Sequence, residues 1–185
     1  MKYTRFLAGE KLQSVSAQFK ATTGELKKEA KSIITKIDSL SVAQAELLLL
    51  ITTIENRCTN TAGKEFFAEN EPVHKLMKRI ASSITTVGYE FSAARQILVW
   101  AFEQIEKMEA SIDRVSKNMA ISPEETVKEL VSLANNINQT LSDITEHIFE
   151  ARQKVFQLTT ELMGEIKNIE PFIERMVNNQ KVVLQ

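Results

Sequence analysis

The feature that most constrains the fold of this chain is an apolar heptad repeat that runs without a break from Val73 to Met119. Its spacings alternate between four and three residues, which averages about 3.5 and favours left-handed supercoiling of an α-helix against its neighbours. We predict one long helix here, about 70 Å in length at about 1.5 Å per residue. The repeat consists of Val73, Met77, Ile80, Ile84, Val87, Phe91, Ala94, Leu98, Ala101, Ile105, Met108, Ile112, Val115 and Met119.

A second long helix is predicted directly after this one. Ser122 suits the N-cap, Pro123 the first turn, and Glu125 lies three residues beyond Ser122, as in a capping box. The same alternation of three and four then continues through Val127, Leu130, Ala134, Ile137, Leu141, Ile144, Ile148, Ala151, Val155, Leu158 and Leu162.

The apolar pattern changes near the C-terminal end of this second helix. A step of four residues from Leu162 to Ile166 follows another step of four, which shifts the apolar positions around the helix. Pro171 lacks a backbone donor, so we predict a kink or break there and a short C-terminal helix beyond it.

The first part of the chain is less regular and leaves two interpretations open. One apolar series has a slip after Leu26, and a second series begins at Ala43: Leu12, Val15, Phe19, Thr22, Leu26, Ala30, Ile33, Ile37 and Leu40, then Ala43, Leu47, Leu50 and Ile54. Either one helix spans about 5–58, or two helices meet near Ser41, which with Gln44 resembles a capping box. The lack of glycine and proline near Ser41 favours the continuous helix.

These patterns predict an all-α fold, an elongated antiparallel bundle of three to five long helices with coiled-coil packing. Only 5 glycines and 3 prolines occur in 185 residues, too few for the turns of a sheet protein. We expect a single domain over residues 1–185, with long helices at about 5–58, 72–119 and 123–170. Short connectors make consecutive helices antiparallel neighbours.

Charge and cysteine content narrow the function classes. A net charge of −1 provides no field for nucleic acid, so we expect no nucleic-acid partner. The single cysteine, Cys58, excludes a disulfide framework or a thiolate cluster. Residues 1–10 have no apolar core of a signal peptide. The expected location is the cytoplasm, or export without a cleavable signal peptide.

Two histidines are the strongest candidates for metal ligands. Glu71 and His74 have the Glu-x-x-His spacing of bundle di-iron sites, but a second such pair is missing. Asp143 and His147 lie four residues apart and outside the apolar repeat. A solvated helix face is the simpler interpretation of both pairs, so we expect no metal site and no cofactor.

Nothing in the sequence predicts catalysis. Cys58 has no histidine near it in sequence and lies near the end of a predicted helix, where the helix dipole disfavours a thiolate. Gly63-Lys64 lacks the spaced glycine of a phosphate-binding loop. We expect no catalytic residue, no small-molecule substrate and no enzymatic activity.

Two stretches are more apolar than a bundle core requires, because one helix face accommodates only about three residues in seven. They are 47–51 and 97–102. Either other parts of the same chain cover them, with Phe66, Phe67 and Phe172 nearest, or they contact a partner protein or lipid. The candidate interaction residues are Leu47, Leu48, Leu49, Leu50, Ile51, Phe66, Phe67, Val99, Trp100, Phe102 and Phe172.

These observations favour a structural or interaction protein that packs on copies of itself, as a homo-oligomer, or on a partner helix. The first alternative is a membrane-active helical protein, soluble when folded, like helical toxins or secretion translocators of virulence-associated export systems. The low-odds alternative is a metal-holding bundle.

Overall fold

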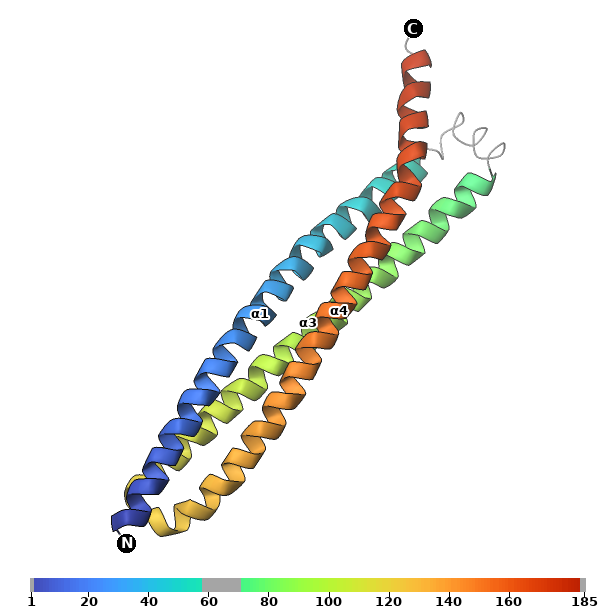
Figure 1. The fold of residues 1–185 in the computed structure, drawn as a ribbon. Helices are drawn as coiled ribbons and strands as arrows, with labels where there is room; N and C mark the ends of the chain where they lie inside the picture. The colour runs from blue at the N-terminus through green and yellow to red at the C-terminus, as the bar shows by residue number, and fades with distance from the viewer. Residues whose placement is uncertain (1, 58–70, 184–185) are drawn as a thin grey trace. The chain divides into compact units, whose positions relative to one another are not determined.

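The computed structural model describes the backbone of residues 2–57 and 71–183 and most of their side chains. It contains three long α-helices that pack against one another: α1 (Lys2–Arg57), α3 (Glu71–Ile121) and α4 (Pro123–Val183), drawn in Figure 1. The described residues contain no strand, so the predicted all-α fold is confirmed. Coiled-coil packing of the helices stays a prediction.

The first helix is continuous, which decides between the two interpretations of residues 5–58. α1 passes through Ser41 without interruption. The hydroxyl of Ser39 donates to the carbonyl of Thr35 at 3.0 Å, one turn earlier in the same helix. The serines of this segment therefore do not start a new helix, and nothing else in the local sequence prevents helix propagation.

The buried positions of α1 follow one heptad register from Leu12 to Ile54, without the predicted slip. The register includes polar residues, notably Thr23, which is buried, and Gln44, which is half-buried. The predicted core positions Thr22 and Leu50 are wrong, since both side chains are exposed. The physical reason is that the buried positions keep their heptad spacing even where the residue is polar. A prediction that assigns only apolar residues to the core must shift the register at such positions.

α3 agrees closely with its predicted repeat. Every described position of the repeat is buried except Met108, which is half-buried, and the side chain of Val73 lies outside the described residues. Ile84 and Phe91 have no exposed surface. The glycine inside the repeat, Gly88, does not interrupt the helix.

α4 begins directly after α3, with Ser122 as the single residue between them. The amide of Ser122 donates to Asn118 O at 2.8 Å, and the amide of Thr126 donates to Ser122 O at 3.2 Å. The backbone hydrogen bonds of the two helices thus meet at Ser122. The start of α4 at Pro123 matches the prediction.

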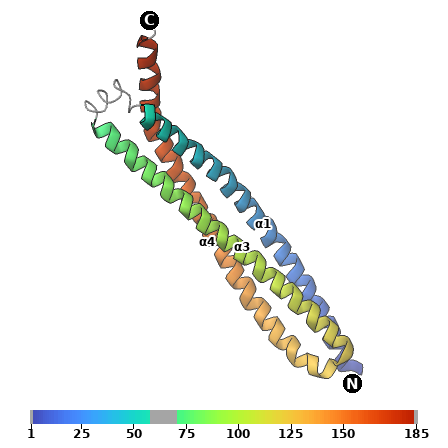
Figure 2. The same cartoon turned by 180° about the vertical axis from the view of Figure 1, so that it is seen from behind.

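Of the kink or break predicted at Pro171, the break is wrong, and so is the separate short helix beyond it. α4 continues through Pro171 to Val183, and its ribbon changes direction near this end in Figures 1 and 2. A proline removes one intrahelical hydrogen bond, which bends a helix more readily than it ends a long one. Ile166, predicted to be in the core, is exposed, because Leu162 and Ile169 keep the seven-residue spacing of buried positions.

The chain divides into two compact units, which we describe one at a time. The first unit comprises residues 1–34 and 95–152. In it, α3 runs antiparallel to α1 and α4 (Figures 1 and 2). Its largest fully buried side chains are Phe19, Leu98, Ile105, Ile144 and Ile148.

The second unit comprises residues 35–94 and 153–185. It has the same arrangement of three helical segments, and Lys154 of α4 pairs with Glu90 of α3 at 3.1 Å. Its largest fully buried side chains are Ile37, Ile51, Ile80, Ile84, Phe91, Leu158 and Leu162. The prediction of a single domain over residues 1–185 stays a prediction.

The buried repeat of α3 should carry a large share of the stability of the second unit. We expect Phe91→Ala, at a position with 0% exposure, to lower the free energy of unfolding by about 3–5 kcal/mol. The control Tyr89→Ala, at 74% exposure two residues away, should change it by less than about 0.5 kcal/mol. Urea denaturation followed by circular dichroism measures both, and equal losses would contradict the assigned core.

Candidate interaction surfaces

The predicted apolar patch at residues 47–51 is divided between the core and the surface of the second unit. Ile51 is buried, while Leu47 and Leu48 are half-buried. Leu50 is exposed, and Leu49 is 68% exposed. Part of this patch therefore lies in the core, and the rest forms an exposed surface centred on Leu49.

The predicted patch around Trp100 belongs to the first unit and is mostly packed. Trp100 and Phe102 are half-buried, and Val99 is exposed. The ring centroid of Trp100 lies 4.6 Å from that of His147 on α4, with the ring planes tilted by 41°. His147 Nδ1 lies 2.6 Å from the carbonyl oxygen of Asp143. Trp100 thus contributes to the contact between α3 and α4.

Several predicted residues lie outside the described part of the chain. These are Phe66 and Phe67, together with Cys58, and the side chains of Phe172 and Glu71. Among the described residues, no group of three or more His, Cys, Asp or Glu side chains is arranged to hold a metal ion. His147, one of the two candidate ligands, is engaged with Trp100 as described above.

An exposed apolar surface on α4 in the second unit was missed by the sequence analysis. Phe156 and Met163 lie seven residues apart and are 70% and 58% exposed. The polar or small residues that share their side of the helix are Gln153, Gln157, Thr160 and Gly164. We call these six residues the α4 outer face. The seven-residue spacing of two large apolar residues outside the core repeat was the signal that could have revealed it.

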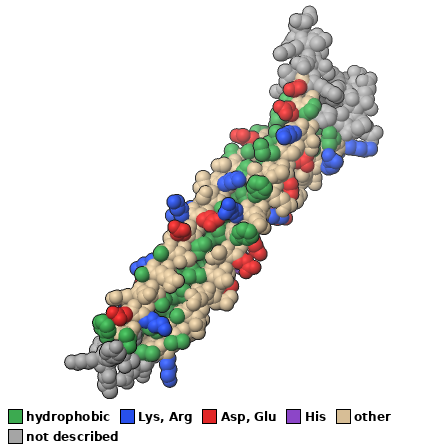
Figure 3. All heavy atoms as spheres, viewed as in Figure 1, with side chains coloured by type: hydrophobic (Ala, Val, Ile, Leu, Met, Phe, Trp, Pro, Cys, Tyr) green, Lys and Arg blue, Asp and Glu red, His purple; other side chains and the backbone are tan. Residues whose placement is uncertain are grey.

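The six residues themselves are uncharged, but the exposed Lys167 lies on the same side of α4, four residues beyond Met163. The hydrogen bonds recorded for the six residues stay within α4. The hydroxyl of Thr160 donates to Phe156 O at 3.1 Å, and Gln157 Nε2 donates to Glu161 Oε1 at 2.9 Å. No atom lies within 4 Å of the position that a Cβ of Gly164 would take. Figure 3 shows hydrophobic side chains at the molecular surface over α4, interspersed with basic and acidic side chains.

α1 also presents exposed apolar side chains. Val42 and Leu49 lie seven residues apart and are both exposed. Within Gly9–Ile54, an 18-residue window reaches a mean hydropathy of 1.5, with 22% of the window buried. By length and composition, α1 therefore meets the criteria for a membrane-spanning helix, as do the core helices of many soluble proteins.

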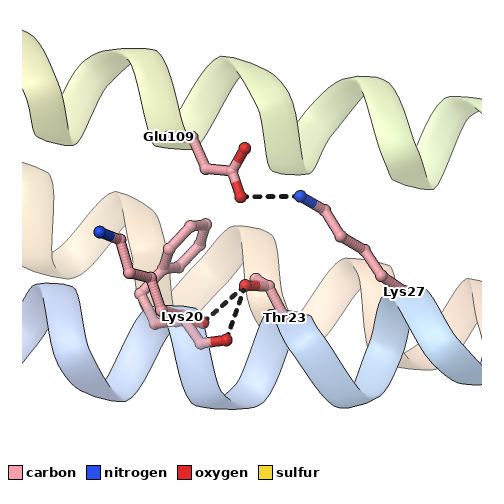
Figure 4. Close-up of polar contacts among 5 residues, drawn as sticks. Lys20, Thr23, Lys27 and Glu109 are labelled. Atoms are coloured by element: carbon pink, nitrogen blue, oxygen red, sulfur yellow. Dashed lines mark hydrogen bonds and ion pairs between the residues drawn. The ribbon is translucent and has the colours of Figure 1, made fainter.

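Two buried threonines donate their hydroxyls to backbone carbonyls four residues earlier in the chain. Thr23 donates to Phe19 O at 2.8 Å in α1, and Thr126 donates to Ser122 O at 2.6 Å. Figure 4 shows the Thr23 hydroxyl directed at the backbone of the preceding turn of α1. In the next turn, Lys27 Nζ pairs with Glu109 Oε1 of α3 at 2.7 Å. The threonines thus occupy core positions without needing a partner on another helix.

Gln44 behaves differently, because its side chain bonds to another helix. Its Nε2 donates to the backbone carbonyl of Ile84 in α3 at 3.1 Å. This approach depends on Gly88, since a Cβ at that position would lie 2.8 Å from Gln44 Nε2 and 3.1 Å from its Cδ. Gly88 therefore makes room for a polar contact that links α1 to α3 in the second unit.

No protein-family model matches the chain, and neither a characterised protein nor a solved structure is significantly similar to it. Inferences about its function therefore begin from the surfaces described above. Among them, the α4 outer face presents two large apolar side chains one heptad apart, Phe156 and Met163.

The contact between Gln44 and Gly88 can be tested with glycine-to-alanine substitutions. Gly24→Ala, at an exposed position with nothing within 4 Å, should stabilise the chain by about 0.5–1 kcal/mol through helix propensity. Gly88→Ala should gain little, because displacing the Gln44 amide loses a hydrogen bond worth about 0.5–1.5 kcal/mol.

The same Gly88→Ala change should recover a gain of about 1 kcal/mol in a Gln44→Ala background, where no amide is displaced. Urea denaturation of the four variants in a double-mutant cycle measures this coupling. Equal gains from Gly88→Ala in both backgrounds would show that Gln44 and Gly88 are independent.

Proposed function

We propose that this chain is a non-enzymatic helical-bundle protein that acts by packing its exposed apolar helix faces on copies of itself or on a partner helix. The observation that carries the proposal is the α4 outer face, where Phe156 and Met163 remain exposed on one side of a helix whose opposite side fills the core. These side chains contribute little to the packing of their own unit.

The proposal draws support from the energetics of apolar exposure. Full burial of a side chain such as Phe or Met is worth about 1.5–3 kcal/mol, so leaving both exposed forgoes a stabilisation comparable to that of a weak interface. Single exposed apolar residues need no explanation, but regularly spaced ones on one helix face are typical of interaction surfaces. A helical partner would contact such a row at intervals of three, four and seven residues.

Self-association is measured by sedimentation equilibrium of the full chain between about 10 μM and 1 mM. We expect an average mass that rises with concentration above the 20.9 kDa of the monomer. Because burial of apolar side chains is not screened by salt, association should not weaken between about 0.1 and 1 M sodium chloride. A constant monomer mass up to the highest concentration would contradict self-assembly.

The second candidate function is membrane activity, and the apolar window of α1 is the observation that favours it. A helix that meets the length and hydropathy criteria for spanning, with 22% of the window buried, has apolar surface for lipid if the helices separate. We expect such activity to appear as dye release from anionic liposomes at neutral or acidic pH. Intact liposomes under all these conditions would exclude this candidate.

A further inference from the structure

The turn between α3 and α4, which lies within the first unit, is short for a connection between two long helices (Figures 1 and 2). Ser122 alone separates the helices, whereas helix–helix connections in bundles commonly have about two to eight residues. Its amide donates to Asn118 O at 2.8 Å, and its carbonyl accepts the amide of Thr126 at 3.2 Å. Both bonds join residues four apart, as in an α-helix, so helical hydrogen bonding reaches the turn from both sides.

The buried positions keep their heptad spacing across this turn. Met119 near the end of α3, and Thr126 and Leu133 in α4, lie seven residues apart, and all three side chains are buried. A hairpin does not require this spacing, because its two helices approach the core separately and in opposite directions. In a continuous helix the three side chains would lie on one side, so the buried stripe of α3 would lead directly into that of α4.

We propose that the α3–α4 hairpin opens at Ser122 into one continuous helix and that two copies of this chain then exchange their α4 helices. In the exchanged dimer, α4 of each copy packs against α1 and α3 of the other copy. The surfaces are complementary because they are the ones that already pack within a single chain. This inference goes beyond the proposed function, since it uses the buried stripes rather than the exposed apolar faces.

The ion pairs between the helices are compatible with the exchange. Arg152 of α4 pairs with Glu29 of α1 at 3.3 Å in the first unit. Lys154 of α4 pairs with Glu90 of α3 at 3.1 Å in the second unit. In the exchanged dimer each pair forms between copies instead of within one copy, so no ionic contact of α4 is lost.

Opening of the hairpin also preserves backbone hydrogen bonds. In a continuous helix, each amide of residues 122–126 would donate to the carbonyl four residues earlier. The bonds of Ser122 and Thr126 already exist, and Pro123 has no amide hydrogen to donate. Glu124 and Glu125 lie in the first turn of α4, where amides have no intrahelical acceptor. Their amides therefore gain acceptors when α3 and α4 become one helix.

Pro123 sets the balance between the two forms. The residue before a proline is biased away from the helical conformation, so Pro123 favours the turn at Ser122. A proline ring within a helix also clashes with the carbonyl four residues earlier. Pro171 shows that this chain accommodates a proline inside a long helix, because α4 continues through it to Val183. Pro123 therefore makes opening less favourable without preventing it.

Cross-linking of two single-cysteine variants tests the exchange. Asn118 Nδ2 lies 3.4 Å from Glu129 Oε2 across the turn, so a short bis-maleimide reagent can join cysteines at these positions. In a Cys58→Ser background, full-length Asn118→Cys and Glu129→Cys chains are mixed, unfolded in urea and refolded together at about 0.5 mM, where mass action favours a dimer. Exchange places residue 118 of one copy beside residue 129 of the other, so we expect a covalent dimer that contains both variants.

Each single-cysteine variant refolded alone is the control for this experiment. In the exchanged dimer, the two copies of residue 118 lie eleven residues apart along the helices, which is about 16 Å. The same holds for the two copies of residue 129. We therefore expect at least fivefold less covalent dimer from either variant alone than from the mixture.

Variants of the turn test the hinge. Pro123→Ala removes the bias against a helical Ser122 and should tighten dimerisation at least tenfold. Insertion of two glycines after Ser122 interrupts the continuous helix and lengthens the turn, and should weaken dimerisation at least tenfold. Pro171→Ala, which removes a proline from α4 away from the turn, is the matched control and should stay within twofold. Sedimentation equilibrium after refolding measures all four chains, and circular dichroism verifies that each is helical.

The outcomes separate this inference from the proposed function. Mixed covalent dimers, together with tighter association of Pro123→Ala and weaker association of the insertion variant, support the exchange of α4. A chain that dimerises without joining residues 118 and 129 of different copies overturns the exchange, and association through the exposed faces then stands. Equal dimerisation of all the turn variants overturns the hinge at Ser122. A chain that stays monomeric at every concentration overturns both the exchange and self-assembly.

Discussion

The structure depends on the burial of one apolar stripe along each of three long helices. Large apolar side chains with no exposed surface fill the core, such as Phe91 in the second unit and Leu98 in the first. A stripe that recurs at intervals of three and four stays on the inward side of a helix over many turns. Positions outside that stripe are free to differ in character, as the exposed Phe156 on the outer side of α4 illustrates.

Polar residues within the buried stripes are accommodated in two ways, and the two have different consequences. Thr23 and Thr126 donate their hydroxyls to carbonyls of the preceding turn, so they fill space in the core without contacting another helix through hydrogen bonds. Gln44 instead donates to a carbonyl of α3, and Gly88 provides the space for it. The threonines therefore need only a side chain of suitable size on the facing helix, whereas Gln44 needs a facing helix with an accessible carbonyl and a glycine beside it.

Much of this architecture could be predicted from the sequence, because positions buried at regular intervals along a helix appear as apolar residues at the same intervals in the sequence. The repeat of α3, the start of α4 at Pro123 and the continuity of α1 all follow from spacing and from the positions of proline and glycine. The polar core positions could not be predicted, since burial of Thr23 or Gln44 depends on whether a bonding partner lies within reach. The same holds for Pro171, where the remaining hydrogen bonds of α4 outweigh the one that is lost. Of the two exposed apolar surfaces, only the one at Leu49 was predicted, from the apolar run around it. Phe156 and Met163 were not predicted, because the core repeat of their helix is complete without them.

The bond from Gln44 to Ile84 bears on how many alignments of α1 and α3 are possible. Heptad stripes are nearly self-similar, so a helix displaced by seven residues meets almost the same apolar surroundings as before. Such a displacement of α1 would bring Ile37 or Ile51 to Gly88 and would move the Gln44 amide away from the Ile84 carbonyl to which it donates. The hydrogen bond of Gln44 and the space at Gly88 thus favour the native register of α1 and α3 over registers shifted by one heptad.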